Sequence, residues 1–290
     1  MSGLSESVVD LYFGREVCGN LPVASGREWL VTNGMGGFAM GTISGELTRR
    51  CHGLLIADLC PPLGLTLLVT ALAETAHYAG QSYPLHTFRW AGDYVYPHGY
   101  RYLESFRLEG SIPTWIYACA DALLEKRIWM DPDSFTTYVQ YRHMRGGVPL
   151  ALKIKALVNY RDYHGVTIDA EEQGWVMQVE AVESGLKITA TEVAVPYYLL
   201  CQKSAWSPRH EWYAGFMLAV EQERGFDGLE DHLWAGELQA VLEPGEELTV
   251  IATLDAGAAL DGNDANARRR AYELHPVEDT QIHSAGVEPR

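Results

Sequence analysis

Hydrophobic and polar residues alternate along much of the chain with a period of two, the spacing of a strand that buries one face. The clearest run covers residues 135–142. One face carries Phe135, Thr137, Val139 and Tyr141, and the other carries Thr136, Tyr138, Gln140 and Arg142. This pattern predicts a half-buried strand.

Four further segments repeat the alternation, and strands are predicted over 123–130, 150–158, 175–181 and 248–254. In the second of these, Lys153 and Lys155 lie opposite an apolar face. The residues between 130 and 135 are Asp-Pro-Asp-Ser, which suit a tight turn. The strands on either side of this turn are therefore expected to form a hairpin.

Helical periodicity is rare. The first residues and Asp264–Leu274 are the best helix candidates, with Asp264 as N-cap of the second and Arg268, Arg269 and Arg270 on its exposed side. Many strands at short spacing without alternating helices predict an all-β fold: a large antiparallel β-sandwich, or supersandwich, with few short helices. We divide the chain into an N-terminal extension (1–26), the β-sandwich domain (27–258), and a helix with a polar linker (259–290).

The net negative charge of the chain makes anionic binding partners unfavourable. The 38 acidic residues outnumber the 22 Lys and Arg residues, giving a formal net charge of -16. Such a charge repels nucleic acid and anionic membranes, whereas a neutral sugar polymer is unaffected. We expect no nucleic-acid or membrane partner.

The cysteines and the apolar segments indicate a cytoplasmic protein. Five cysteines at irregular spacing, without a C-x-x-C pair, are typical of reduced thiols. The start MSGLSESVVD has neither the basic nor the apolar part of a signal peptide. Residues 53–73 are apolar, but Asp58, Pro61 and Pro62 interrupt them, which excludes a membrane helix.

A glycine-rich segment follows the strand-like run that ends near Val31. Gly34, Gly36 and Ala39 match the dinucleotide-binding fingerprint, but the residues after them are poor helix formers, and the fingerprint needs a helix. Alternatively, Asn33, Gly34, Gly36 and Gly37 form a tight loop between strands, where glycine supplies positive φ angles. A third interpretation is a loop that also contacts a ligand or a partner domain.

A basic segment, Thr48–Gly53, precedes another apolar strand. Adjacent residues of a strand point to opposite faces, so one of Arg49 and Arg50 is expected to turn inward and pair with carboxylates or carbonyls. His52 is interpreted as a hydrogen-bonded core histidine, with a base or metal ligand as the alternative. The histidines show no metal-ligand spacing, and we assign neither a metal nor a cofactor.

Seven aromatic residues crowd into 83–102, where the 11% average predicts about two. Arg89, Trp90, His98 and Tyr100 are the candidates here for contacting a glycan, because flat rings cover sugar C–H faces and polar groups bond the hydroxyls. Packing between sheets is the other interpretation. A second group, Trp206–Phe216, has the same two interpretations.

Catalytic residues cannot be assigned from spacing. Glycoside hydrolysis needs two carboxyl groups a few ångströms apart, and 38 acids offer no unique pair. Glu104, flanked by apolar residues, is a candidate buried carboxyl, held with a raised pKa or in an ion pair. The sequence contains neither a serine nucleophile elbow nor a P-loop.

Several ordered blocks resemble the N-terminal domain of bacterial and archaeal glycogen debranching enzymes (amylo-α-1,6-glucosidases). The first is REWLVTNGMGGFAMGTISGELTRRCHGLLIA, and the later ones are YPHGYRYLESFRLEG, LEKRIWM, LVNYRDYH, HEWYAGFMLAVEQERGFDG and LEPGEE. Together they extend from about Arg27 to Leu254. Cys51 departs from the pattern, since the family more often has an aromatic residue there.

The resemblance implies a β-sandwich that precedes an (α/α) toroidal glycosidase domain bearing the catalytic carboxylates. It marks Asn33–Gly37 and Arg49–Gly53 as signature segments that contact substrate or brace the domain interface. The implied function is a non-catalytic module that assists α-glucan binding and the hydrolysis of α-1,6 branch points by that domain. A dinucleotide-dependent oxidoreductase and a purely structural docking domain are the alternatives.

Overall fold

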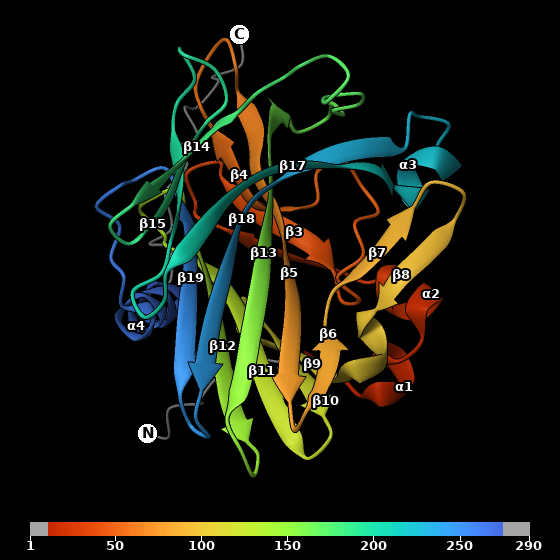
Figure 1. Ribbon diagram of the computed structural model, residues 1–290, viewed down its shortest axis with the longest axis vertical. Coiled ribbons are helices and arrows are strands. Elements are labelled where there is room, and N and C mark those ends of the chain that lie inside the picture. The colour runs from red at the N-terminus through yellow and green to blue at the C-terminus, as the bar shows by residue number, and fades with distance from the viewer. Residues whose placement is uncertain (1–10, 275–290) are drawn as a thin grey trace, which may run out of the picture.

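Two antiparallel sheets make up most of the computed structural model, which describes residues 11–274 (Figure 1). The nine-stranded sheet has the order β1 (Leu11–Phe13), β9 (Leu103–Glu109), β10 (Ile112–Cys119), β11 (Ala122–Met130), β12 (Thr136–Arg145), β19 (Glu247–Thr253), β16 (Tyr197–Leu200), β15 (Gly185–Thr189) and β14 (Gln178–Val182). The predicted all-β sandwich is confirmed.

The ten-stranded sheet packs against it. Its order is β2 (Glu28–Thr32), β3 (Phe38–Thr42), β4 (Gly53–Asp58), β5 (Leu65–Tyr78), β13 (Leu150–Asp162), β18 (Leu229–Leu242), β17 (Trp206–Met217), β7 (Thr87–Trp90) and β8 (Tyr94–His98), with β6 (Gln81–Pro84) paired to β5. The helices are few and short, as predicted: α1 (Arg15–Cys18), α2 (Leu21–Ser25), α3 (Ala219–Glu223), α4 (Gly262–Leu274) and the 3-10 helix η1 (Gly99–Tyr102).

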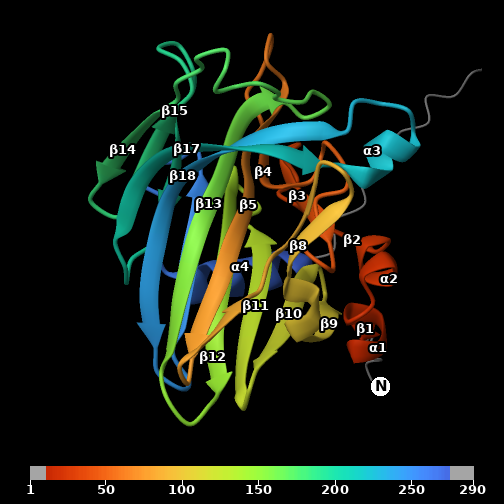
Figure 2. The ribbon, with the colours of Figure 1, turned by 45° about the vertical axis from the view of Figure 1, so that its right-hand side comes forward.

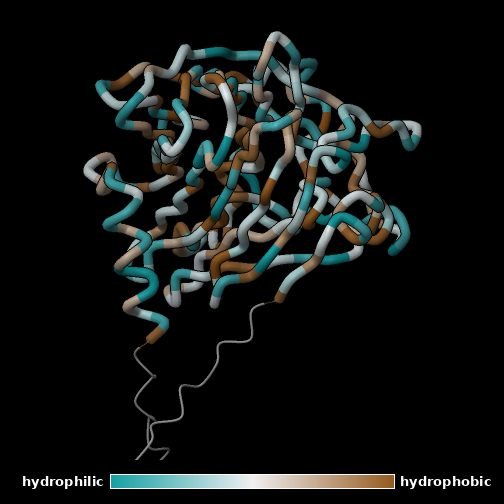
Figure 3. Tube along the Cα trace, turned by 90° about the horizontal axis from the view of Figure 1, so that it is seen from below, coloured by the Kyte–Doolittle hydropathy of each residue, from teal (hydrophilic) through white to brown (hydrophobic). Residues whose placement is uncertain are grey.

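The main core lies between the two sheets. In β13, Leu152 and Ile154 point into it, while Lys153 and Lys155 lie on the outer face of the ten-stranded sheet, as the alternation predicts. Hydrophobic and hydrophilic positions are interspersed along the chain trace in Figure 3. A second apolar cluster, which includes Phe88 and Phe216, covers part of the outer face where β7 lies beside β17.

The hairpin predicted around residue 132 is confirmed. β11 and β12 pair in antiparallel register up to Met130 opposite Thr137. The Asp131 carboxylate accepts a hydrogen bond from the Asp133 N–H at 3.1 Å, which closes the turn. The predicted strand at 175–181 is shorter than expected, because β14 begins at Gln178 and the Trp175 indole instead donates to the Ala190 carbonyl at 3.2 Å.

The prediction that β12 is half-buried is wrong, because α4 covers the face turned away from the core. Tyr138 is 1% exposed, and its hydroxyl donates to the Ala259 carbonyl at 3.1 Å. The Gln140 amide donates to the Asn263 side chain at 3.1 Å. Figure 2 shows α4 behind the strands, on the outer side of the nine-stranded sheet.

Two details of the predicted α4 are also wrong. The carboxylate that caps its N-terminus belongs to Asp261 rather than Asp264, and it accepts from the N–H groups of Asn263 at 2.9 Å and Asp264 at 3.2 Å. Arg269 was expected on the exposed side, yet only 5% of it is exposed. Its guanidinium donates to the Thr32 carbonyl and the Ser111 hydroxyl, which lie far from it in the sequence.

The ends of the chain are described only in part. The helix expected at the first residues and the linker expected over 275–290 lie outside the described residues. Within the described part, β1 pairs with β9 and so extends the nine-stranded sheet. None of the helices of residues 11–274 is long and apolar enough to cross a membrane. The division at 27 and 258 stays a prediction.

Candidate functional site

The first signature segment, 33–37, is the loop of the antiparallel β2–β3 hairpin. The buried Asn33 organises it: its side-chain oxygen accepts from the N–H groups of Met35 and Gly37, both at 2.9 Å, and its amide donates to the Ser134 carbonyl at 3.1 Å. The loop is thereby tied to the turn before β12.

The glycines of this loop serve two purposes. Gly34 and Gly36 have φ angles of 73° and 93°, which side chains disfavour. At Gly37, a Cβ atom would lie 2.6 Å from the Phe135 ring. The chain then continues as β3 rather than as a helix, so the segment lacks the helix N-terminus that a dinucleotide fingerprint needs to hold a pyrophosphate.

The second signature segment is a turn, not a strand, so the expectation that Arg49 and Arg50 point to opposite strand faces is wrong. Arg49 Nε donates to Glu28 at 2.5 Å. His52 is 1% exposed; its Nδ1 accepts from the Thr48 N–H at 3.1 Å, so the proton sits on Nε2, which lies 3.1 Å from the same Glu28 oxygen. His52 is thus a hydrogen-bonded core histidine.

These contacts shift two pKa values. The hydrogen bond from His52, together with the one from Arg49, lowers the pKa of Glu28 to about 2. Burial lowers the pKa of His52 and keeps its ring neutral. This arrangement fixes the turn and leaves the imidazole without a free acceptor nitrogen for general base chemistry or a metal ion.

Arg50 ties the turn to two distant loops. Its guanidinium donates to the carbonyls of His164 and Asp227, both at 2.8 Å, and its backbone N–H donates to Glu221 at 3.2 Å. The guanidinium of Arg50 is thus paired with carbonyl oxygens of both loops.

The two signature segments do not form one site. They adjoin opposite ends of β2, since the turn contacts Glu28 and the loop begins after Thr32. At about 3.3 Å per residue this separates them by roughly 15 Å. The loop instead lies against α4, whose Arg269 donates to the Thr32 carbonyl at 2.8 Å and to the Ser111 hydroxyl at 2.6 Å.

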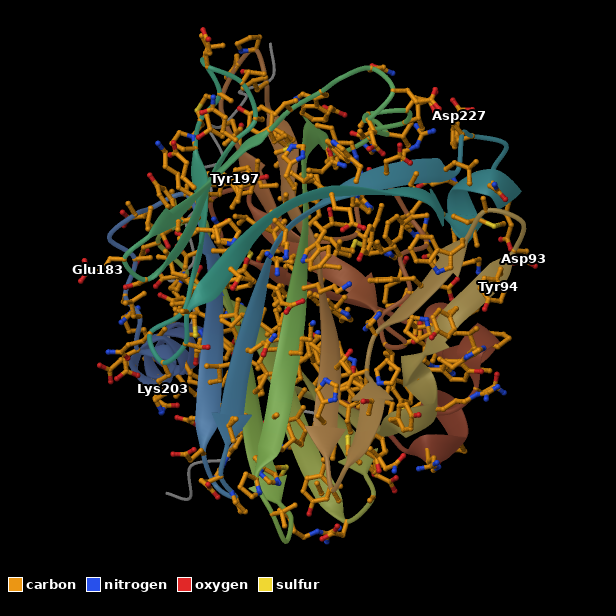
Figure 4. All side chains as sticks on the ribbon, in the orientation of Figure 1. Asp93, Tyr94, Glu183, Tyr197, Lys203 and Asp227 are labelled. Carbon is orange, nitrogen blue, oxygen red and sulfur yellow. The ribbon has the colours of Figure 1, made fainter. Side chains whose placement is uncertain are left out.

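The aromatic stretch 83–102 divides into packed and exposed rings. Phe88 is 4% exposed and packs against Phe216. Tyr94 and Tyr96 are 60% and 56% exposed and stack at 6.2 Å along the edge strand β8. In Figure 4, Tyr94 lies at the outer end of the β7–β8 hairpin.

The row continues along the same face of the chain, with His98 6.5 Å from Tyr96 and Tyr100 6.1 Å from His98, measured between ring centroids. Arg89, by contrast, faces the buried carboxylate of Glu46 and also pairs with Asp93. The structure thus places His98 and Tyr100 in the exposed aromatic row, while Trp90 packs on Phe88 and Phe216 and Arg89 forms ion pairs.

Glu104 and the second aromatic group have contacts that stabilise the fold. Glu104 is not the buried carboxyl that its neighbours predicted: its side chain is 48% exposed and lies 2.9 Å from the Arg15 guanidinium. Most of the second aromatic group packs into the protein interior, with Trp206, Trp212 and Phe216 between 1% and 9% exposed, whereas Tyr213 is partly exposed.

A groove of about 300 Å³ lies between the β7–β8 hairpin and the outer face of the ten-stranded sheet. Its lining includes Trp90 and Tyr96, together with Tyr213 of the second aromatic group and with Lys153 and Lys155, which were not among the predicted site residues. Lys153 and Lys155 could have been found from the sequence, because both lie on the polar face of the strand predicted over 150–158. The described lining contains no carboxyl group, so the groove lacks the acid and base of a glycosidase.

A larger groove of about 620 Å³ lies near α3, between the loop that contains Asp169 and the start of β18. Its lining includes five carboxylates, Asp169, Glu171, Glu172, Asp227 and Asp231, beside Trp212 and Phe226. Asp231 accepts from the Gly215 N–H at 2.9 Å. Among residues 11–274, no three His, Cys, Asp or Glu side chains are grouped so as to hold a metal ion.

Comparison with known proteins identifies the family. A search of curated proteins finds no match. The family model described as "Glycogen debranching enzyme N terminal" matches residues 27–249, which include β2 to β18 and both signature segments. The match covers more than half of the 290 residues, and the chain therefore belongs to the glycogen debranching enzyme N-terminal family.

Proposed function

We propose that this chain is a non-catalytic module of a cytoplasmic glycogen debranching enzyme. The module assists α-glucan binding, and a separate (α/α) toroid domain hydrolyses the α-1,6 branch points. The observation that carries the proposal is the family match over residues 27–249.

The exposed rings of β8 support the glucan-binding part. Tyr94 and Tyr96 present stacked aromatic faces to solvent, and a tyrosine ring orders few torsions when it binds. A pyranose ring offers a flat C–H surface to such a ring and hydroxyls to the polar groups around it. The net charge of -16 does not oppose a neutral polymer.

A purely structural docking domain is the second candidate, and one observation favours it. Asn33, Arg49, Arg50 and His52 satisfy their hydrogen-bonding groups largely within the domain, as a bracing role requires. In this alternative the module supports the toroid domain without affinity for glucan.

Titration calorimetry of the 290-residue chain with maltoheptaose separates the two candidates. The proposal predicts a saturable heat of binding that persists at high salt, because the ligand is neutral. Absence of binding at millimolar maltoheptaose would contradict the glucan-binding role and favour the purely structural docking domain. Cellohexaose, which has the same monomer in β-1,4 linkage, is the matched control ligand and is expected to bind more weakly.

A further inference from the structure

The groove beside β8 is lined by both aromatic rings and polar groups. Its volume of about 300 Å³ is at the lower limit for ligand pockets in proteins. Trp90 and Tyr96 contribute to one side, and Lys153, Lys155 and Tyr213 come from the outer face of the ten-stranded sheet. These residues belong to four strands, β7, β8, β13 and β17.

The aromatic wall is held in place by bonds within the protein. The Trp90 indole N–H donates to the Tyr96 carbonyl at 2.7 Å, which joins β7 to β8 beyond their ladder pairing. The Trp90 ring also packs on Phe216 at 4.5 Å between centroids. The Tyr96 ring, in contrast, is 56% exposed, so it is free to cover a ligand. Such pre-organisation lowers the entropy lost on binding.

The cations of the groove are anchored as well. Lys155 Nζ donates to the Tyr213 hydroxyl at 2.7 Å and lies 4.0 Å from the centre of the Trp234 ring. Lys153 Nζ lies 2.7 Å from Glu237, which neutralises its charge. An ammonium carries three N–H donors, so the bond to Tyr213 leaves others for a ligand. The groove therefore offers hydrogen-bond donors, with the charge of Lys153 balanced by a carboxylate and the ammonium of Lys155 lying over an aromatic ring.

His86 supplies an acceptor. Its Nδ1 lies 3.0 Å from the Glu74 carbonyl, so Nδ1 carries the proton, and burial lowers the pKa of the ring and keeps it neutral. Nε2 is then an acceptor, and His86 is part of the groove lining. An apolar wall, several donors and an acceptor match a hexose ring, which has C–H faces and hydroxyls around its edge.

We infer that this groove binds a glucosyl residue of an α-glucan chain, with Tyr96 covering one face of the sugar and Lys155 donating to its hydroxyls. The stacked ring of Tyr94 extends the aromatic surface along β8. The bound glucan chain therefore continues past the tip of the β7–β8 hairpin. The inference rests on the proposed function and assigns its glucan contact to one place on the module.

The test compares variants of the 290-residue chain in titrations with maltoheptaose. Tyr96→Ala and Lys155→Met are each expected to weaken binding about tenfold, since they remove the covering ring and the main donor. Tyr12→Ala is the matched control, because Tyr12 is 63% exposed on β1 of the other sheet. In the wild-type chain, the indole N–H resonance of Trp90 is expected to shift on titration.

The outcomes separate the inference from the proposed function. Binding that Tyr96→Ala and Lys155→Met leave unchanged, with a stationary Trp90 resonance, overturns the groove assignment while the proposed function survives. A wild-type chain that binds no maltoheptaose overturns both. Equal weakening by Tyr12→Ala also contradicts the assignment, because it places the effect outside the groove. Near-ultraviolet circular dichroism verifies that each variant is folded.

Discussion

At the scale of single residues, the signature side chains act through hydrogen bonds inside the domain. Asn33 satisfies two backbone donors and one carbonyl, and Glu28 gathers Arg49 and His52 around one carboxylate. The sequence pointed to Asn33, Arg49 and His52 and predicted that one of Arg49 and Arg50 is paired. It did not reveal the shared partner Glu28, because Glu28 lies 24 residues from His52 and the pairing follows from the tertiary fold.

Replacing Asn33 tests the bracing role of the first loop. Asn33→Ala leaves the buried N–H of Gly37 and the Ser134 carbonyl without partners, and we expect it to lower the free energy of unfolding by about 2–3 kcal/mol. Urea unfolding monitored by tryptophan fluorescence measures the loss. The control is Asn20→Ala, since Asn20 is exposed and makes no side-chain capping bond; it is expected to change stability by under about 0.5 kcal/mol.

Glu28 predicts a pH dependence. Its pKa is lowered from 4.5 to about 2 in the folded chain, so its contribution to stability is complete above about pH 4.5 and is lost as the pH falls toward about 2. Glu28→Gln should therefore destabilise the protein at pH 6 and differ less from the wild type near pH 2.5. Urea unfolding of both proteins across this window measures the gap, and a gap that stays constant with pH argues against the pairing.

At the scale of elements, the period-two alternation predicted the strands but did not reveal that α4 covers the outer face of β12. The alternation in β13 and in the β11–β12 hairpin is visible locally, because each strand meets the core on one face. The second buried face of β12 is created by α4, and the Tyr138–Ala259 bond joins residues 121 apart. The polar side chains of that face, such as Gln140, predict exposure to solvent, because the sequence pattern of β12 does not show that α4 covers them.

Arg269 holds α4 to the body of the domain. Arg269→Ala removes bonds to Thr32 and Ser111 and leaves their oxygens without this donor, so we expect a loss of about 2–4 kcal/mol in unfolding free energy. Arg268→Ala is the control, because Arg268 is half exposed and pairs with Asp131 on the surface; its expected cost is under about 1 kcal/mol. Equal losses in urea unfolding would show that Arg269 is not the anchor.

At the scale of the whole molecule, the candidate glucan site is assembled from strands far apart in sequence. Trp90 and Tyr96 were visible as part of one aromatic cluster and Tyr213 as part of another, but these rings and Lys155 meet only through the strand order β13-β18-β17-β7-β8. Strand order depends on long-range pairing, which local pattern does not encode. The family assignment came from ordered motifs and holds independently of the groove.

A paired hydrolysis assay on a glycogen limit dextrin, which presents α-1,6 branch stubs, tests whether the chain is a non-catalytic module. Glucose release is measured first with the 290-residue chain alone, and then with the same chain joined to an (α/α) toroid glycosidase domain. We predict no release by the chain alone, and release by the joined protein that exceeds that of the toroid domain without the chain. Glucose release by the chain alone would contradict the account.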